Sequence, residues 1–69
     1  MSRRRLTRFG IQVMSVLADR QIPLWQLAEM VEAKTGRFVT TEYLRNCLHG
    51  VPTPWYVMKA IREILNLRG

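Results

Sequence analysis

The chain has 69 residues, of which 48% are hydrophobic and 23% are charged, and its formal net charge is +6. This length has room for one domain, and the composition is that of a folded globule, which excludes a disordered tail. The single cysteine excludes an internal disulfide, and no apolar run is long enough for a membrane span or a signal peptide. We therefore expect one cytoplasmic domain that does not enter a membrane.

The basic charge is concentrated at the start of the chain. Four of the eleven basic residues are Arg3, Arg4, Arg5 and Arg8, whereas residues 9–69 carry seven bases against five acids. A basic tip on a nearly balanced body suits contact with a polyanion. We predict a basic arm over residues 1–6, in which Arg3, Arg4 and Arg5 contact the polyanion, and one domain over residues 7–69. The alternative is a solvated terminus that only aids solubility.

Helical periodicity predicts the first two elements. Thr7 can cap a first helix that runs to about Arg20. Its core stripe is Phe9, Val13, Val16 and Leu17. Pro23 opens a second helix, which stops near Thr35 because Gly36 can take the left-handed conformation that closes a helix. Its core stripe is Leu24, Leu27, Ala28 and Val31.

A third, shorter helix follows a short return. Thr40 or Thr41 is its side-chain cap, it extends to about Leu48, and Gly50 is placed to end it. The inward residues are Leu44, Cys47 and Leu48, so Cys47 is expected to be a core residue.

A fourth helix completes the predicted domain. Thr53 is a candidate cap and Pro54 a candidate first helical residue, and the helix reaches about Asn66. Its inward stripe is Val57, Ala60, Ile61 and Ile64. No segment has the alternation of a strand, so the expected fold class is all-α, a compact four-helix domain.

The third helix presents a polar face opposite its leucines. At 100° per residue, Glu42, Arg45, Asn46 and His49 lie on the outward side, with Thr40 and Thr41 at the tip. Asn pairs with adenine, Arg with guanine, Glu accepts from cytosine, and a Thr methyl contacts thymine. The same residues also suit an ordinary solvated face, so residue types alone do not decide between the two interpretations.

A family resemblance favours DNA. It begins at Phe9, covers almost all of the chain, and rests on several segments. These are Phe9-Gly10 with Val13 and Val16, Ile22 with Leu27-Ala28, Val39-Thr40-Thr41-Glu42-Tyr43-Leu44, Leu48-His49-Gly50, and Pro54 with the run from Ile61 to Leu67. The chain resembles the Cro-repressor-like, or lambda-repressor-like, helix-turn-helix family of the xenobiotic-response-element type.

The resemblance implies a lambda-repressor-like helix-turn-helix domain, with room for a short fifth helix. It also implies a sequence-specific double-stranded DNA-binding transcriptional regulator, in context a prophage or mobile-element repressor. Carried over by position, the base-contacting sites fall on Thr41, Glu42 and Asn46, and Thr40 and His49 match positions at phosphate or the groove wall.

The chain departs from the family in the turn before the third helix. Between Ala28 and Gly50 it is roughly six residues longer than the usual spacing, and we expect the excess, over residues 32–38, to fall in the turn. The family's phosphate-contacting glutamine is Leu24 here. Lys34 and Arg37, in the longer segment, are predicted to replace it as phosphate partners.

Two apolar clusters are candidate dimer interfaces. One is the outer stripe of the first helix with Ile11, Met14 and Ala18, and the other is Trp55 in the fourth helix. Each cluster has two interpretations. It is a surface through which two copies dimerise on a palindromic operator, or it is covered by neighbouring segments of the chain. We expect a homodimer at least on DNA.

The sequence predicts neither catalysis nor bound cofactors. Cys47 and His49 are two residues apart and point in different directions on a helix, so no metal site is expected. No nucleophile, base and orienting group form a recognisable motif, so we do not expect an enzyme. The rival function is a protein-interaction module, such as an antirepressor or an antitoxin-like partner.

Overall fold

The computed structural model describes residues 6–67, and these residues form four α-helices and no strand. The helices are α1 (Arg8–Arg20), α2 (Leu24–Thr35), α3 (Thr41–Leu48) and α4 (Trp55–Leu65). The expected all-α, four-helix class is confirmed. Of the predicted arm, Arg3, Arg4 and Arg5 lie outside the described residues. None of the four helices has the length and apolar character that crossing a membrane requires.

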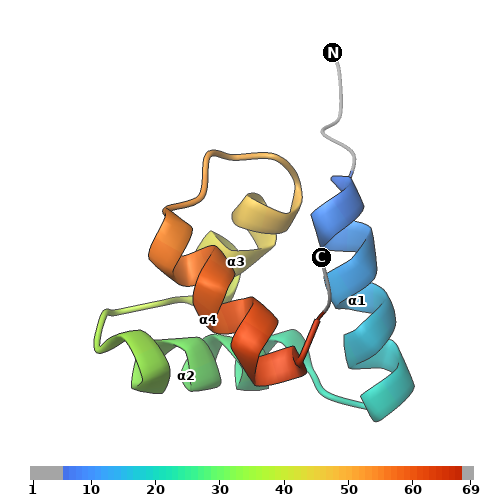
Figure 1. The fold of residues 1–69 in the computed structure, drawn as a ribbon, viewed down its shortest axis with the longest axis horizontal. Helices are drawn as coiled ribbons and strands as arrows, with labels where there is room; N and C mark the ends of the chain where they lie inside the picture. The colour runs from blue at the N-terminus through green and yellow to red at the C-terminus, as the bar shows by residue number, and fades with distance from the viewer. Residues whose placement is uncertain (1–5, 68–69) are drawn as a thin grey trace.

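The helices pack around one core. α4 packs mainly on α2, and α3 packs on both α2 and α1. In Figure 1, α1 stands upright at one side, α2 lies across the bottom and α4 passes in front of α3. The radius of gyration is 11.3 Å, close to the value of about 11 Å for a compact chain of this length.

The core contains only apolar side chains. Among residues 6–67 no polar or charged side chain is buried. The predicted stripes are largely confirmed, since most of their residues are buried in the core, and all four helices contribute. The buried core residues are Val13, Leu17, Leu27, Ala28, Val31, Leu44, Cys47, Leu48, Val57, Ala60, Ile61 and Leu65, with Val39 from the turn.

Four predicted core positions lie at the rim instead. They are Phe9, Val16, Leu24 and Ile64, which are only partly buried. Leu65, which the prediction left out, is 1% exposed. Leu65 comes one helical turn after the buried Ile61 and lies on the same side of α4. The Arg62 guanidinium lies 5.5 Å from the centroid of the Phe9 ring and helps to cover it.

The helix ends follow the predicted caps with one repeated error. Thr7 caps α1, and its hydroxyl accepts from the Gly10 N–H at 2.9 Å. Gly36 ends α2 with a φ of 72°. Pro23 and Pro54, however, are N-caps, and the interpretation of Pro54 as a first helical residue, with Thr53 as the cap, was wrong. A proline ring fixes φ and leaves ψ open, and here both prolines have an extended ψ, 154° and 145°.

Gly10 allows α1 to approach the end of α3 closely. The Thr7 N–H donates to the Leu48 carbonyl at 3.1 Å, and the Thr7 hydroxyl donates to the same oxygen at 3.3 Å. Gly10 is buried one turn later, where a Cβ atom would overlap the Leu48 carbonyl oxygen. The absence of a side chain at Gly10 therefore sets the distance between α1 and α3.

We predict that Gly10→Ala destabilises the protein by about 1–3 kcal/mol, because the added methyl group overpacks the contact with Leu48. In an unconstrained helix the same change stabilises by about 0.5–1 kcal/mol. Ala18→Gly, at an exposed position of α1, measures that ordinary preference in the same helix. The measurement is urea unfolding, and a Gly10→Ala variant more stable than the parent would contradict the account.

Candidate nucleic-acid interface

α3 separates its apolar and polar residues on opposite sides. Leu44, Cys47 and Leu48 are buried, as predicted, and Cys47 is a free cysteine within the core. Glu42, Arg45 and Asn46 are exposed, as is Thr40 before the helix, while Thr41 and His49 are partly buried. The outward face expected from helical periodicity is thus present on the surface. Its outermost side chains carry one carboxylate, one guanidinium and one carboxamide.

Thr40, rather than Thr41, is the cap of α3. Its hydroxyl accepts a hydrogen bond from the Tyr43 N–H at 3.0 Å. A side-chain oxygen at this position satisfies one of the backbone donors that a helix start leaves unpaired. The hydroxyl hydrogen stays available for a further acceptor, so capping does not prevent Thr40 from donating to a ligand.

His49 closes the other end of α3. Its N–H donates to the carbonyls of Arg45 and Asn46, at 3.2 and 3.1 Å, and its ring Nδ1 lies 2.9 Å from the Arg45 carbonyl oxygen. Because that oxygen can only accept, Nδ1 carries the proton, and only Nε2 faces other partners. His49 was predicted at the groove wall, and the structure gives its ring this additional role at the helix end.

The turn before α3 is held by Glu32. The Glu32 carboxylate accepts from the Val39 N–H at 3.0 Å, and the Glu32 carbonyl accepts from the Gly36 N–H at 2.9 Å. Val39 is buried and anchors the end of the turn in the core. Sequence reasoning missed Glu32, because a seven-residue separation is not a spacing that helix periodicity singles out.

Only the second half of the longer segment, residues 32–38, lies in the turn before α3. Residues up to Thr35 continue α2, so the prediction that the whole excess falls in the turn was wrong for residues 32–35. The reason is that residues 32–35 continue the helix without interruption until Gly36 takes a positive φ. Five residues, 36–40, connect the two helices.

Lys34 and Arg37 both have partners on α4. The Lys34 Nζ lies 3.4 Å from a Glu63 carboxylate oxygen, and the Arg37 guanidinium lies 4.8 Å from the centroid of the Tyr56 ring. The structure therefore brings the two predicted phosphate partners together, but at the groove between α2 and α4 and not on the outward face of α3.

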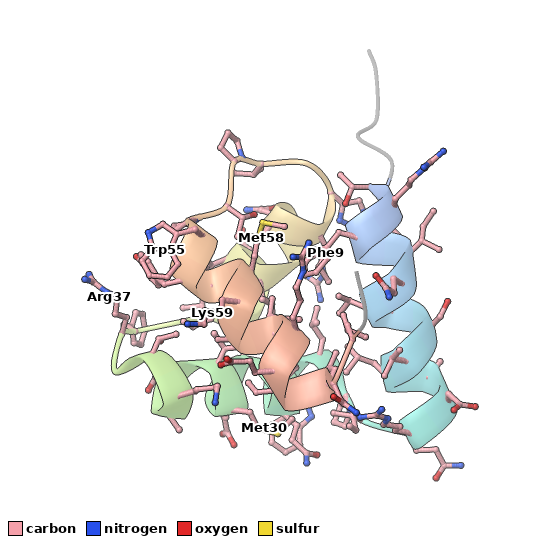
Figure 2. All side chains as sticks on the ribbon, viewed as in Figure 1. Phe9, Met30, Arg37, Trp55, Met58 and Lys59 are labelled. Carbon is pink, nitrogen blue, oxygen red and sulfur yellow. The ribbon has the colours of Figure 1, made fainter. Side chains whose placement is uncertain are left out.

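The candidate dimer residues do not form one patch. Ile11 is 53% exposed and Met14 is 37% exposed on α1, and Trp55 is 73% exposed at the start of α4. In Figures 1 and 2, Trp55 and α1 lie at opposite sides of the molecule. No described segment covers either cluster, so the expectation that neighbouring segments bury them is not met within residues 6–67.

The electrostatics of α3 are simple. No ion pair joins Glu42 to Arg45, so both charges remain available to a ligand. Burial raises the pKa of the Tyr43 phenol, and the neighbouring Cys47 thiol and Tyr56 raise it further. Tyr43 is therefore a neutral hydroxyl at the flank of the helix and adds no negative charge there. Among residues 6–67 no group of three or more His, Cys, Asp or Glu side chains could hold a metal ion.

Comparisons of the chain with family models, with curated proteins and with solved structures found no match.

We predict that Glu32→Ala lowers the free energy of unfolding by about 1–3 kcal/mol, because it leaves the Val39 N–H without its acceptor in a partly buried site. Glu32→Gln keeps an acceptor oxygen and is expected to cost less. Glu29→Ala, which removes an exposed carboxylate one turn earlier on α2, is the matched control. Urea unfolding and amide hydrogen exchange at Val39 measure the effect, and equal costs for the two alanine variants would contradict it.

Proposed function

We propose that the chain is a sequence-specific, double-stranded DNA-binding transcriptional regulator that inserts α3 into the major groove. The observation that carries the proposal is that α3 is held in place by contacts at its ends and on its core side, while its polar side chains remain exposed. α3 is capped and anchored at both ends, and its exposed residues are Glu42, Arg45 and Asn46. A major groove admits one α-helix and presents donors and acceptors that these three side-chain types complement.

The helix order supports a lambda-repressor-like arrangement for this proposal. α2 and α3 are consecutive, packed against each other and joined by residues 36–40. In helix-turn-helix proteins the second helix of such a pair reads base edges from its N-terminal residues. By resemblance, the regulator is a repressor of the prophage or mobile-element type.

Each exposed residue has a proposed role. Arg45 donates to guanine, Asn46 pairs with adenine, and Glu42 accepts from a cytosine amine, which offsets the repulsion between its carboxylate and the phosphates. Thr41 contributes its methyl group to a thymine contact, and Thr40 and His49 contact the backbone. Lys34 and Arg37 are expected to add less to phosphate binding than the sequence suggests, because α4 already engages both side chains.

Two copies are proposed to bind a two-fold operator. Half-sites of such operators lie about 34 Å apart, and each copy has a single α3, so two copies are needed to read both half-sites. Of the two candidate dimer clusters, the proposal uses the stripe of α1, because Ile11 and Met14 are two exposed apolar side chains on one helix, whereas Trp55 is a single one.

Selection of bound duplexes from a random pool tests the proposal, and Asn46→Ala tests the mechanism. We predict that the selected duplexes share a sequence, and that Asn46→Ala and Arg45→Ala each weaken binding to them by about 1–3 kcal/mol with relaxed preference at one base pair. Both positions are exposed, so unfolding free energies should change little.

Arg20→Ala is the charge-matched control for Arg45→Ala. Arg20 is an exposed arginine at the end of α1, about 20 Å along that helix from the contact between Thr7 and α3. Its loss is expected to leave sequence preference unchanged. If the Asn46→Ala and Arg45→Ala variants selected the same sequences as the parent with the same affinity, α3 would not be the reading element.

We further predict that removal of residues 2–5, which carry Arg3, Arg4 and Arg5, weakens binding to every duplex. Each lost phosphate contact reduces the slope of log K against log salt by about 0.9. Binding titrations at several salt concentrations measure this slope on selected and random duplexes. A truncated chain that loses affinity only for the selected sequence would assign the arm to base recognition instead.

A further inference from the structure

A second surface lies between α2 and α4, away from the outward face of α3. It is a solvent-open groove of about 460 Å³, a size within the range of small binding pockets. Lys34 and Arg37 line one side, and Trp55, Tyr56 and Lys59 line the other. In Figure 2, Arg37, Trp55 and Lys59 gather at the same end of the molecule.

The groove has an excess of positive charge. Three of its side chains are cations, and Glu63 is the one carboxylate among the described residues that line it. Glu63 already pairs with Lys34, which leaves the charges of Arg37 and Lys59 uncompensated by the lining. The Arg37 guanidinium lies over the Tyr56 ring, and because it carries five N–H donors, it can still donate hydrogen bonds to a further partner.

Large exposed aromatic side chains border this charge. Trp55 is 73% exposed and contacts the Tyr56 ring edge to face, with 6.0 Å between the ring centroids. Phe38, next to Arg37 in the chain, is 84% exposed. Contacts with duplex phosphates use cationic and hydrogen-bonding groups. The exposed rings of Trp55 and Phe38 would contribute little to such contacts.

Trp, Tyr and Arg are instead the residue types that carry most of the binding energy in protein interfaces. We propose that the groove between α2 and α4 docks an acidic segment of a partner protein, which inserts an aromatic or large aliphatic side chain beside Trp55. Its carboxylates pair with Arg37 and Lys59. This inference goes beyond the proposed DNA binding, since apart from Lys34 and Arg37 the groove is lined by residues to which that proposal gives no role.

The test is selection of random dodecapeptides displayed on phage against the full-length protein without DNA. Enriched peptides are expected to be acidic and to carry an aromatic or large aliphatic residue. Synthetic versions should bind with a saturable affinity that Trp55→Ala and Lys59→Glu each weaken by about tenfold or more.

The chain offers a matched control for each substitution. Trp25→Ala removes another exposed tryptophan, and Arg20→Glu makes another exposed charge reversal. Both are expected to leave peptide binding within about twofold of the parent, and thermal unfolding confirms that all four variants fold. The same variants are measured on duplex DNA, where the groove substitutions should have no larger effect than their controls.

Three results would overturn the inference. One is a selection that enriches no acidic peptides. Another is enriched peptides that bind the Trp55→Ala and Lys59→Glu variants as they bind the parent, which would place them on the basic arm or elsewhere. The third is a loss of duplex affinity specific to the groove variants with no peptide binding, which would assign the groove to DNA.

Discussion

The structure depends on how α3, a helix of eight residues, is held in one position. Helices this short are not stable alone in water, so tertiary contacts must supply the stability. At its end, the Leu48 carbonyl accepts from both the backbone and the hydroxyl of Thr7, and Gly10 permits this close approach of α1. At its start, Thr40 caps the helix and Glu32 fixes Val39. Together these contacts fix α3 without using its outward face.

Because different residues of α3 make these contacts, its position is fixed while its outward side chains stay exposed. The core side of α3 consists of Leu44, Cys47 and Leu48, and the caps lie at its ends. Exposed positions such as Arg45 and Asn46 can therefore change without loss of packing. The groove between α2 and α4 is separate, because it is built from other helices and other side chains.

Much of the fold could be predicted from the sequence, because its signals are local. Helical periodicity predicted the four helices and the inward residues of α3. The residue types predicted Thr7 as a side-chain cap and gave Thr40 as one of two candidates for the cap of α3. The two prolines were predicted to be the first helical residues but are N-caps. The ring constrains φ to the same value in both positions, so the residue type does not distinguish them. Only ψ, which the neighbouring residues determine, distinguishes the two.

The remaining features depend on residues distant in the sequence. The role of Gly10 requires the position of Leu48, the bond from Glu32 requires the path of the turn, and the pairing of Lys34 requires Glu63 on α4. Periodicity within one helix contains no information about these partners. For the candidate site, sequence reasoning identified the exposed face of α3 but could not separate it from the basic and aromatic groove.

The central claim, that the outward face of α3 meets DNA, is tested most directly by titrating the isotope-labelled protein with a selected duplex and following its NMR spectrum. The account predicts that the largest shifts occur at the backbone amides of residues 40–46 and at the side-chain amide of Asn46. It would be contradicted if these signals stayed unchanged while the duplex bound elsewhere, or if the duplex did not bind at all.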